Sequence, residues 1–146
     1  RIIDAWIYAD GKETPQTRPE GVRVISEATA KTLTEMLIGV TQEGGTAESA
    51  SINGYLVAGK TGTTEILTDD STVASFVGFL PARNPALAIA VIVHRPEGIF
   101  GGTVAAPVFR EVALAAMQAL NIAPDPNVVA AQAARNGAGG ERDASQ

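Results

Sequence analysis

The sequence has no cysteine and one histidine, and both absences exclude particular kinds of site. Without cysteine, neither a disulfide framework nor a thiolate-bound metal can form. Because His94 is the one histidine, a histidine-rich metal centre is excluded and a Ser-His-Asp triad is disfavoured. We interpret His94 itself as a surface residue at the end of a strand.

Strong positive charge and long apolar runs are also absent. The net charge is -5 at pH 7 and Lys and Arg form no cluster, which excludes the usual footprint of a nucleic-acid partner. The longest apolar run covers residues 86–93, far short of the roughly 20 residues that a membrane helix needs. The chain begins at Arg1 with no Met and no signal pattern, so we expect an internal part of a longer protein.

Aromatic residues are scarce, at 5% of a chain that is 45% hydrophobic. The core must therefore be built mainly from Ala, Val, Ile and Leu. A length of 146 residues suits one domain or part of one, and the composition is globular and not that of a disordered chain.

The N-terminal third predicts a strand and then a helix. Residues 2–9 are typical of a strand that the turn dipeptide Asp10-Gly11 ends, and residues 12–21 predict a loop or an edge segment. Ser26 is a suitable N-cap for a helix that reaches about Thr41. The spacing predicts one apolar stripe on this helix, formed by Ala30, Leu33, Met36, Leu37 and Val40.

The middle of the chain predicts a three-stranded meander over residues 55–66, 73–80 and 87–93. Short turns at Asp69-Asp70 and Asn84-Pro85 favour antiparallel pairing. We expect Asp69-Asp70 to be a solvated turn and not a metal pair. The third strand is apolar at every position, so we expect both of its faces to be covered.

A second helix is predicted over residues 104–120, with Pro107 in its first turn and a packing face of Val108, Val112, Ala116 and Ala119. The order of elements indicates an α+β fold, a mainly antiparallel sheet covered by helices, within residues 1–123. Residues 124–146 are predicted to be a disordered tail, in which 128–134 could form only a weak helix without a clear apolar face.

Residues 57–64, Val-Ala-Gly-Lys-Thr-Gly-Thr-Thr, carry the clearest chemistry. Gly59 and Gly62 weaken a strand, and the usual reason is the close approach of a ligand or another backbone. Lys60 supplies a positive charge, and the neighbouring threonines supply hydroxyl groups. If this strand lies at the edge of a cleft, it could receive a carboxylate with one cation and several neutral donors.

The motif by itself leaves two other interpretations open. One is a glycine-containing strand with a solvated lysine. The other is a phosphate loop, because residues 54–61 fit the letters G-x-x-x-x-G-K-T. A phosphate loop must open a helix, however, and residues 61–64 are a poor helix start.

The surroundings of the motif resemble monofunctional (class B) penicillin-binding proteins, the transpeptidases that cross-link peptidoglycan. The resemblance rests on residues 57–63, on 73–81 (Val-Ala-Ser-Phe-Val-Gly-Phe-Leu-Pro) and on 101–109 (Gly-Gly-Thr-Val-Ala-Ala-Pro-Val-Phe). Lys-Thr-Gly is one motif of this enzyme group. The resemblance covers about residues 1–124. Thr64 departs from the class B pattern and is more familiar from the bifunctional class A group.

The resemblance implies a serine β-lactamase/transpeptidase-like fold and a set of site roles. Lys60 would sit beside the serine nucleophile. Thr61 and Thr63 would bind the terminal carboxylate of a D-Ala-D-Ala stem peptide or of a β-lactam, with Gly62 and Thr64 also in the substrate site. The Thr63 N–H would form half of an oxyanion hole, which can contribute about 3–4 kcal/mol. No metal or organic cofactor is implied.

The nucleophile of this family lies in Ser-x-x-Lys, and the sequence lacks that motif. Lys12, Lys31 and Lys60 are preceded three residues earlier by Ala, Ala and Val. Residues 51–53 match the letters of a further family motif, Ser-x-Asn, but lie too close to Lys60, and we interpret them as a local turn. We therefore expect an upstream half, in the same protein or in a second chain, to supply both motifs, and this chain alone to be inactive.

Three hypotheses follow. The first is a fragment of a peptidoglycan D,D-transpeptidase, which by resemblance would have an N-terminal membrane anchor and act outside the cytoplasmic membrane in cell division or cell shape. The second is a serine β-lactamase or β-lactam sensor. The third is a non-catalytic binding module with the same fold. A Ser-x-x-Lys motif roughly 200–300 residues upstream would favour the first.

Overall fold

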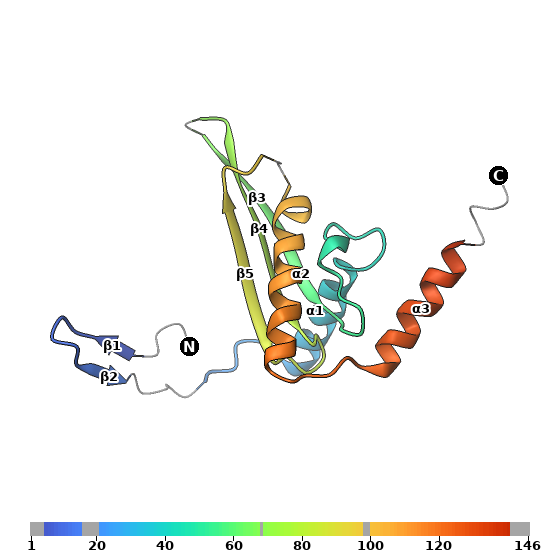
Figure 1. Ribbon diagram of the computed structural model, residues 1–146, viewed down its shortest axis with the longest axis horizontal. Helices are drawn as coiled ribbons and strands as arrows, with labels where there is room; N and C mark the ends of the chain where they lie inside the picture. Colours follow the sequence, from blue (N-terminus) through green and yellow to red (C-terminus); the bar gives the residue numbers. More distant parts are fainter. Residues whose placement is uncertain (1–4, 16–20, 68, 98–99, 141–146) are drawn as a thin grey trace.

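The computed structural model describes residues 5–15, 21–67, 69–97 and 100–140, with side chains as far as Arg135. Its elements are β1 (Ala5–Ile7), β2 (Glu13–Pro15), α1 (Glu27–Gly39), the 3-10 helix η1 (Glu48–Ala50), β3 (Ala58–Ile66), β4 (Ser71–Leu80), β5 (Leu87–His94), α2 (Gly101–Ala119) and α3 (Pro126–Gly140). Helices on an antiparallel sheet confirm the predicted α+β class (Figure 1).

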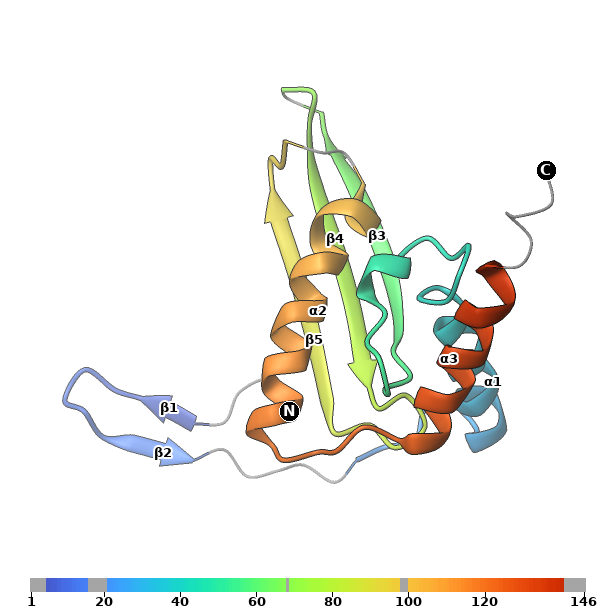
Figure 2. The ribbon, with the colours of Figure 1, turned by 45° about the vertical axis from the view of Figure 1, so that its right-hand side comes forward.

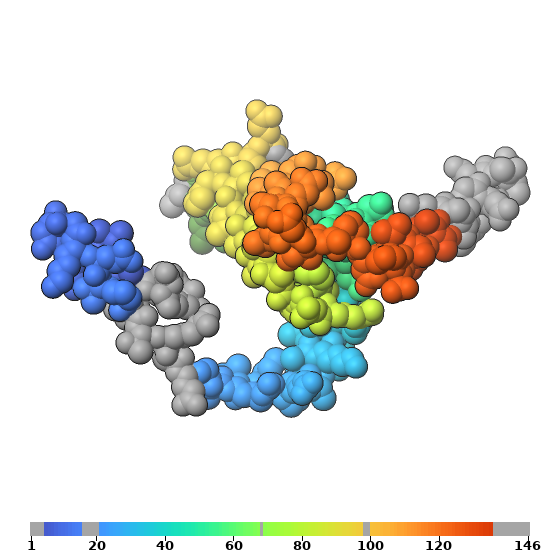
Figure 3. Space-filling view, turned by 60° about the horizontal axis from the view of Figure 1, so that its bottom comes forward, coloured from blue at the N-terminus to red at the C-terminus, as the bar shows by residue number. Residues whose placement is uncertain are grey.

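The first two strands form a separate antiparallel hairpin, in which Ala5 pairs with Pro15 and Ile7 with Glu13. The predicted strand over residues 2–9 is confirmed at 5–7, and residues 2–4 lie outside the described residues. The segment 12–21, predicted to be a loop or edge, supplies the short partner strand β2. Figure 3 shows this hairpin and α3 at opposite ends of the molecule.

The three-stranded sheet has the order β3-β4-β5 and is antiparallel throughout, which confirms the predicted meander. Helix α2 lies along one face of this sheet (Figures 1 and 2). The apolar pattern of β5 predicts cover on both faces by more helices than this chain supplies, and within the described residues α2 packs against one of them. Along β5, residues alternate between half-buried and exposed, and Ile92 on the uncovered face is 63% exposed.

Helix α1 begins where the sequence predicts, because the Ser26 side chain accepts a hydrogen bond from the Thr29 N–H at 3.0 Å. It ends at Gly39, slightly before the predicted Thr41. The predicted apolar stripe is only partly buried: Leu33 is 47% exposed and Met36 is 67% exposed. The buried residue is Ile38, since only the last turn of α1 reaches the sheet, where it packs near Ala58.

Helix α2 begins three residues before the predicted start, so Pro107 lies inside the helix and not in its first turn. The predicted packing face is also wrong, because Val108 and Val112 are about half exposed. The buried residues are Ala105, Ala106, Phe109, Ala113 and Met117. Phe109 and Met117 are the largest fully buried side chains of the helix, and burying them sets its rotation.

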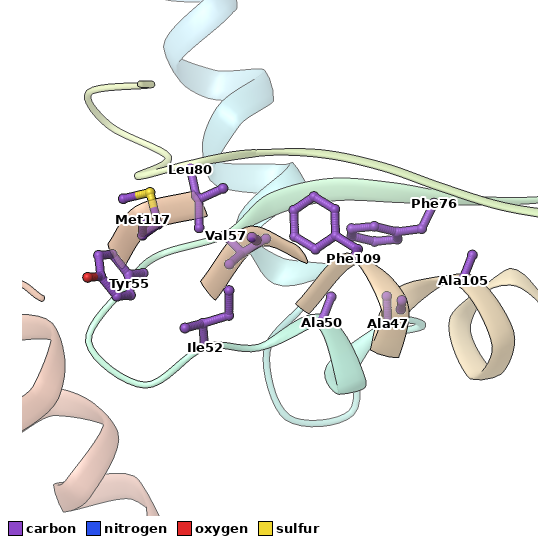
Figure 4. Close-up of a cluster of buried hydrophobic side chains, with 12 residues drawn as sticks. Ala47, Ala50, Ile52, Tyr55, Val57, Phe76, Leu80, Ala105, Phe109 and Met117 are labelled. Atoms are coloured by element: carbon purple, nitrogen blue, oxygen red, sulfur yellow. The ribbon is translucent and has the colours of Figure 1, made fainter. Parts of the chain in front are cut away.

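The main core lies between α2, the sheet and the segment that precedes β3 (Figure 4). The Phe109 ring packs edge-on against Phe76 of β4, with ring centroids 4.8 Å apart and an interplanar angle of 72°. The segment before β3 completes this core with three buried side chains, Ile52, Tyr55 and Val57. The core therefore holds β3 in place through its neighbour β4 and through the turn that leads into it.

The C-terminal segment is helical, which corrects the prediction of disorder for residues 126–140. It is fastened to the turn before β3. The Gly54 N–H donates to Gln132 Oε1 at 2.7 Å, Gln132 Nε2 donates to the Ile52 carbonyl at 3.2 Å, and the Asp125 N–H donates to the Gly54 carbonyl at 2.9 Å. The sequence does not show these bonds, because they join residues 71 to 80 positions apart. The division of the chain at residue 123 stays a prediction.

Candidate functional site

Strand β3 carries the Lys-Thr-Gly-Thr motif at one edge of the sheet. Within the described residues, β4 is its one neighbouring strand. Lys60, Thr63 and Thr64 are exposed, and Thr61 and Gly62 are half-buried. The motif therefore lies on an accessible strand edge, as the carboxylate-binding interpretation requires.

The side chains of the motif are divided between the two faces of the sheet. Residues directly opposite each other in an antiparallel pair share a face. Thr61 lies opposite the buried Phe76, and Thr63 lies opposite the buried Ala74, so both threonines are on the face that α2 covers. Lys60 lies opposite Val77, on the other face, and so by alternation do Gly62 and Thr64.

The Lys60 ammonium nevertheless turns back toward Thr61. Its Nζ atom donates to the Thr61 carbonyl oxygen at 3.0 Å and to Thr61 Oγ1 at 3.1 Å. The positive charge and the Thr61 hydroxyl therefore meet at the strand edge, although the two residues begin on opposite faces.

The start of α2 lies against the same strand. The Gly101 N–H donates to Thr63 Oγ1 at 3.3 Å, and Ser49 Oγ donates to the Gly102 carbonyl at 2.7 Å. A Cβ atom at Gly101 would lie 2.3 Å from the Ser75 carbonyl oxygen, and one at Gly102 would lie 2.0 Å from that of Thr46. Both glycines are therefore required by close backbone contact.

Thr46 is a site neighbour that the sequence did not reveal. Its Oγ1 lies 3.5 Å from Thr61 Oγ1, across a separation of 15 residues. The motif Gly101-Gly102 could have indicated the close approach of a backbone, but nothing in the sequence indicates which strand is approached. Residues 43–46 also resemble the family, but the contact of Thr46 with Thr61 could not be predicted, because its place depends on how the segment after α1 folds back.

The two glycines of the motif differ in their surroundings. A Cβ atom at Gly59 would lie 2.4 Å from the Phe76 ring, so this glycine is required by core packing and not by a ligand. A Cβ atom at Gly62 would lie 2.5 Å from Ser75 Oγ, on the uncovered face. Both glycines of the motif are therefore in close contact with β4, and the close approach of a ligand at Gly62 stays a prediction.

The phosphate-loop interpretation is wrong. Residues 58–66 form one continuous strand, whereas a phosphate loop would open a helix at Thr61. The Ser-x-Asn letters at residues 51–53 belong to a local turn, as predicted: the Tyr55 N–H donates to the Ile52 carbonyl at 3.1 Å, and Arg110 Nε donates to the Ser51 carbonyl at 3.1 Å.

Asp69 serves the turn between β3 and β4. It accepts hydrogen bonds from the hydroxyl and N–H groups of Ser71 and pairs with Arg95. The Ser71 hydroxyl is the main cause that lowers the pKa of the Asp69 carboxyl. Across the described ranges, His, Asp and Glu side chains form no cluster that could hold a metal ion, and none of the helices there could span a membrane.

Comparison with known proteins points to one family. Residues 1–114 match the family model described as the penicillin binding protein transpeptidase domain. The chain is 39% identical to the probable peptidoglycan D,D-transpeptidase PenA of Neisseria flavescens, covering 77% of this chain and 30% of that protein. It is 38% identical to the penicillin-binding protein PbpB of Mycolicibacterium smegmatis, covering 86% of this chain and 22% of that protein.

Among solved structures, the transpeptidase domain of penicillin-binding protein 3 from Burkholderia pseudomallei superposes with a TM-score of 0.67 and 36% identity, covering 77% of this chain and 37% of the other. The chain therefore spans less than a third of the length of the two relatives above.

Proposed function

The chain belongs to the penicillin-binding protein transpeptidase family, and from this premise we propose that it is the carboxylate-binding part of a peptidoglycan D,D-transpeptidase. Its relatives are of the class B type that the motifs indicated. The substrate would be a stem peptide that ends in D-Ala-D-Ala, and a β-lactam would acylate the same site.

The observation that carries this proposal is the arrangement on β3. An exposed strand edge brings the Lys60 ammonium to within 3.1 Å of the Thr61 hydroxyl, with the Thr63 hydroxyl on the same face as Thr61. A cation with two hydroxyl donors suits a terminal carboxylate. In the proposal Gly62 lets the substrate lie along the strand, and Thr64 extends the contact on the other face.

The chemistry needs a serine nucleophile that this chain does not supply. We propose that an upstream half carries Ser-x-x-Lys and Ser-x-Asn and packs on the face of the sheet opposite α2, beyond the end near Ala58 that α1 covers. This face bears Lys60, and it exposes Val77 by 53% and Ile92 by 63%. A nucleophile placed there would lie beside the lysine, and the acyl oxyanion would be held by the Thr63 N–H together with the N–H of the serine.

A labelled penicillin tests the proposal. The protein that contains both halves should be labelled covalently, and this chain alone should not. In the two-half protein, Lys60→Ala and Thr63→Val should each lower the rate of labelling by about tenfold or more, because each removes a charged or polar contact to the carboxylate. Covalent labelling of this chain alone would overturn the assignment of the nucleophile to the upstream half.

The lifetime of the adduct separates the transpeptidase from a β-lactamase. A long-lived acyl-enzyme, together with cross-linking of stem peptides, supports the transpeptidase, whereas rapid turnover of penicillin supports a β-lactamase. If penicillin never labels the two-half protein, the result favours a non-catalytic binding module. We further propose, by resemblance to the relatives, that the whole protein acts at the outer face of the cell membrane in cell-wall synthesis.

A further inference from the structure

The hydroxyl of Thr63 is held by the main chain of a distant segment. Gly101 is the first residue of α2, and the N–H groups of the first turn of a helix have no partner within the helix. The preceding Phe100 makes no side-chain cap. The Gly101 N–H instead donates to Thr63 Oγ1 at 3.3 Å, across 38 residues of sequence. A side chain of β3 therefore accepts a hydrogen bond from an N–H group at the start of α2 that has no partner within the helix.

This bond decides what the Thr63 hydroxyl can do. A threonine hydroxyl has one proton and two lone pairs, and an amide N–H can only donate. Because Thr63 Oγ1 accepts from Gly101, its own proton points away from Gly101. The same reasoning applies to Thr61, since the Lys60 ammonium has no lone pair and donates to Thr61 Oγ1 at 3.1 Å. The Thr63 hydroxyl is thus oriented to donate to a further group, and the Thr61 hydroxyl can donate either to Thr46 Oγ1, 3.5 Å away, or to the same further group.

We propose that Gly101 is a positioning residue that makes the β3 site selective for a carboxylate. Two hydroxyls that each donate a proton match a group that only accepts, which a carboxylate does. An ester in the same place has no charge and is a weaker acceptor. The inference rests on the proposed function and deepens it, since it assigns to Gly101 the orientation of a hydroxyl that binds the substrate.

Only glycine allows this contact. A Cβ atom at residue 101 would lie 2.3 Å from the Ser75 carbonyl oxygen and 2.6 Å from the Gly62 carbonyl oxygen. Both are backbone atoms of the sheet and cannot turn aside as a side chain can. Gly101→Ala must therefore move the start of α2 away from β3 and break the hydrogen bond to Thr63.

The test compares a penicillin with its methyl ester in the two-half protein. The measured quantity is the ratio of the two second-order rate constants of acylation, free acid over ester. We expect Gly101→Ala to lower this ratio by about tenfold, since the Thr63 hydroxyl is no longer held in the orientation that donates a charge-assisted hydrogen bond to the carboxylate. Thr63→Val should lower it similarly, and adding Gly101→Ala to Thr63→Val should lower it no further, because the glycine acts through that hydroxyl.

Gly54→Ala is the matched structural control. Gly54 has a φ of +82°, and a Cβ atom there would lie 2.4 Å from Pro124, so the substitution is strained and remote from Thr63. It should lower the melting temperature and leave the ratio unchanged. If Gly101→Ala does not fold, Gly102→Ala serves instead: its Cβ atom would lie 2.0 Å from the Thr46 carbonyl oxygen, so it must displace the same first turn of α2 and should lower the ratio.

The outcomes separate the two claims. Suppose that the wild-type protein is labelled. If its ratio is unchanged by Gly101→Ala, or if Gly54→Ala lowers the ratio equally, then the role of Gly101 is overturned and the proposed function is not. A ratio that survives Gly102→Ala would do the same. A wild-type protein that neither compound acylates overturns the proposed function and this inference with it.

Discussion

Replacing Gly59 by alanine should destabilise the protein, although the change adds a single methyl group to a strand. The new Cβ atom would lie 2.4 Å from Cζ of Phe76, about 1 Å less than the 3.4 Å at which ordinary contact begins, and 2.9 Å from the Val77 carbonyl oxygen. The Phe76 ring cannot move aside, because it is fully buried and packed edge-on against Phe109.

The expected magnitude follows from two opposing terms. Overpacking a tight core costs about 1–3 kcal/mol. Removing a glycine from a strand returns roughly 0.5–1 kcal/mol of conformational entropy. The free energy of unfolding should therefore fall by about 1–2 kcal/mol in Gly59→Ala. Because Gly59 directly precedes Lys60, acylation by a penicillin should slow as well.

Urea denaturation followed by circular dichroism measures this change. Gly39→Ala is the control, since a Cβ atom at Gly39 meets nothing within 4 Å, and it should be neutral or stabilising by up to about 1 kcal/mol. Phe76→Leu should cost less in the Gly59→Ala background than in the wild type, by about 1 kcal/mol, because it removes the clashing ring atoms. If Gly59→Ala were as stable as Gly39→Ala, the packing argument would be refuted.

Three further predictions concern the frame around the site. Tyr55→Phe should lower the free energy of unfolding by about 1 kcal/mol, because it removes the 2.6 Å hydrogen bond from the tyrosine hydroxyl to the Ile122 carbonyl, and thermal melting of the two proteins checks this. Ser26→Ala should cost about 0.5–2 kcal/mol by removing the N-cap of α1, whereas Ser26→Asp should retain most of the stability, as urea titration would show. The contribution of Asp69 should be present above its ordinary pKa of 3.8 and be lost as the pH falls through its lower folded-state pKa. Asp69→Asn should reduce the acid dependence of unfolding; an unchanged pH profile would contradict this assignment.

Where a signal was local, the sequence predicted the structure. The antiparallel meander followed from short turns between apolar runs, and Ser26 caps α1 because its side chain bonds three residues ahead. The family was identified in the same way. The letters of the Lys-Thr-Gly-Thr run, with the segments that follow, indicated the family before any contact was known.

The errors arose where packing and not pattern decides. Val108 and Val112 repeat at helical spacing, yet α2 is rotated so that Phe109 is buried against Phe76. Leu33 and Met36 also repeat correctly, but only the end of α1 reaches the sheet. Periodicity gives the existence of an apolar face, whereas its orientation depends on which residues the neighbouring elements can accommodate.

The sequence by itself determined the family, the order of strands and helices and the identity of the motif, since each is written in residues that are close together along the chain. The tertiary structure alone decided that α2 covers the face of β3 that bears Thr61 and Thr63, that Gly101 holds the Thr63 hydroxyl and that Gln132 fastens α3 to the turn before β3. These contacts join residues far apart in sequence, and they exist only once the sheet and α2 have packed together.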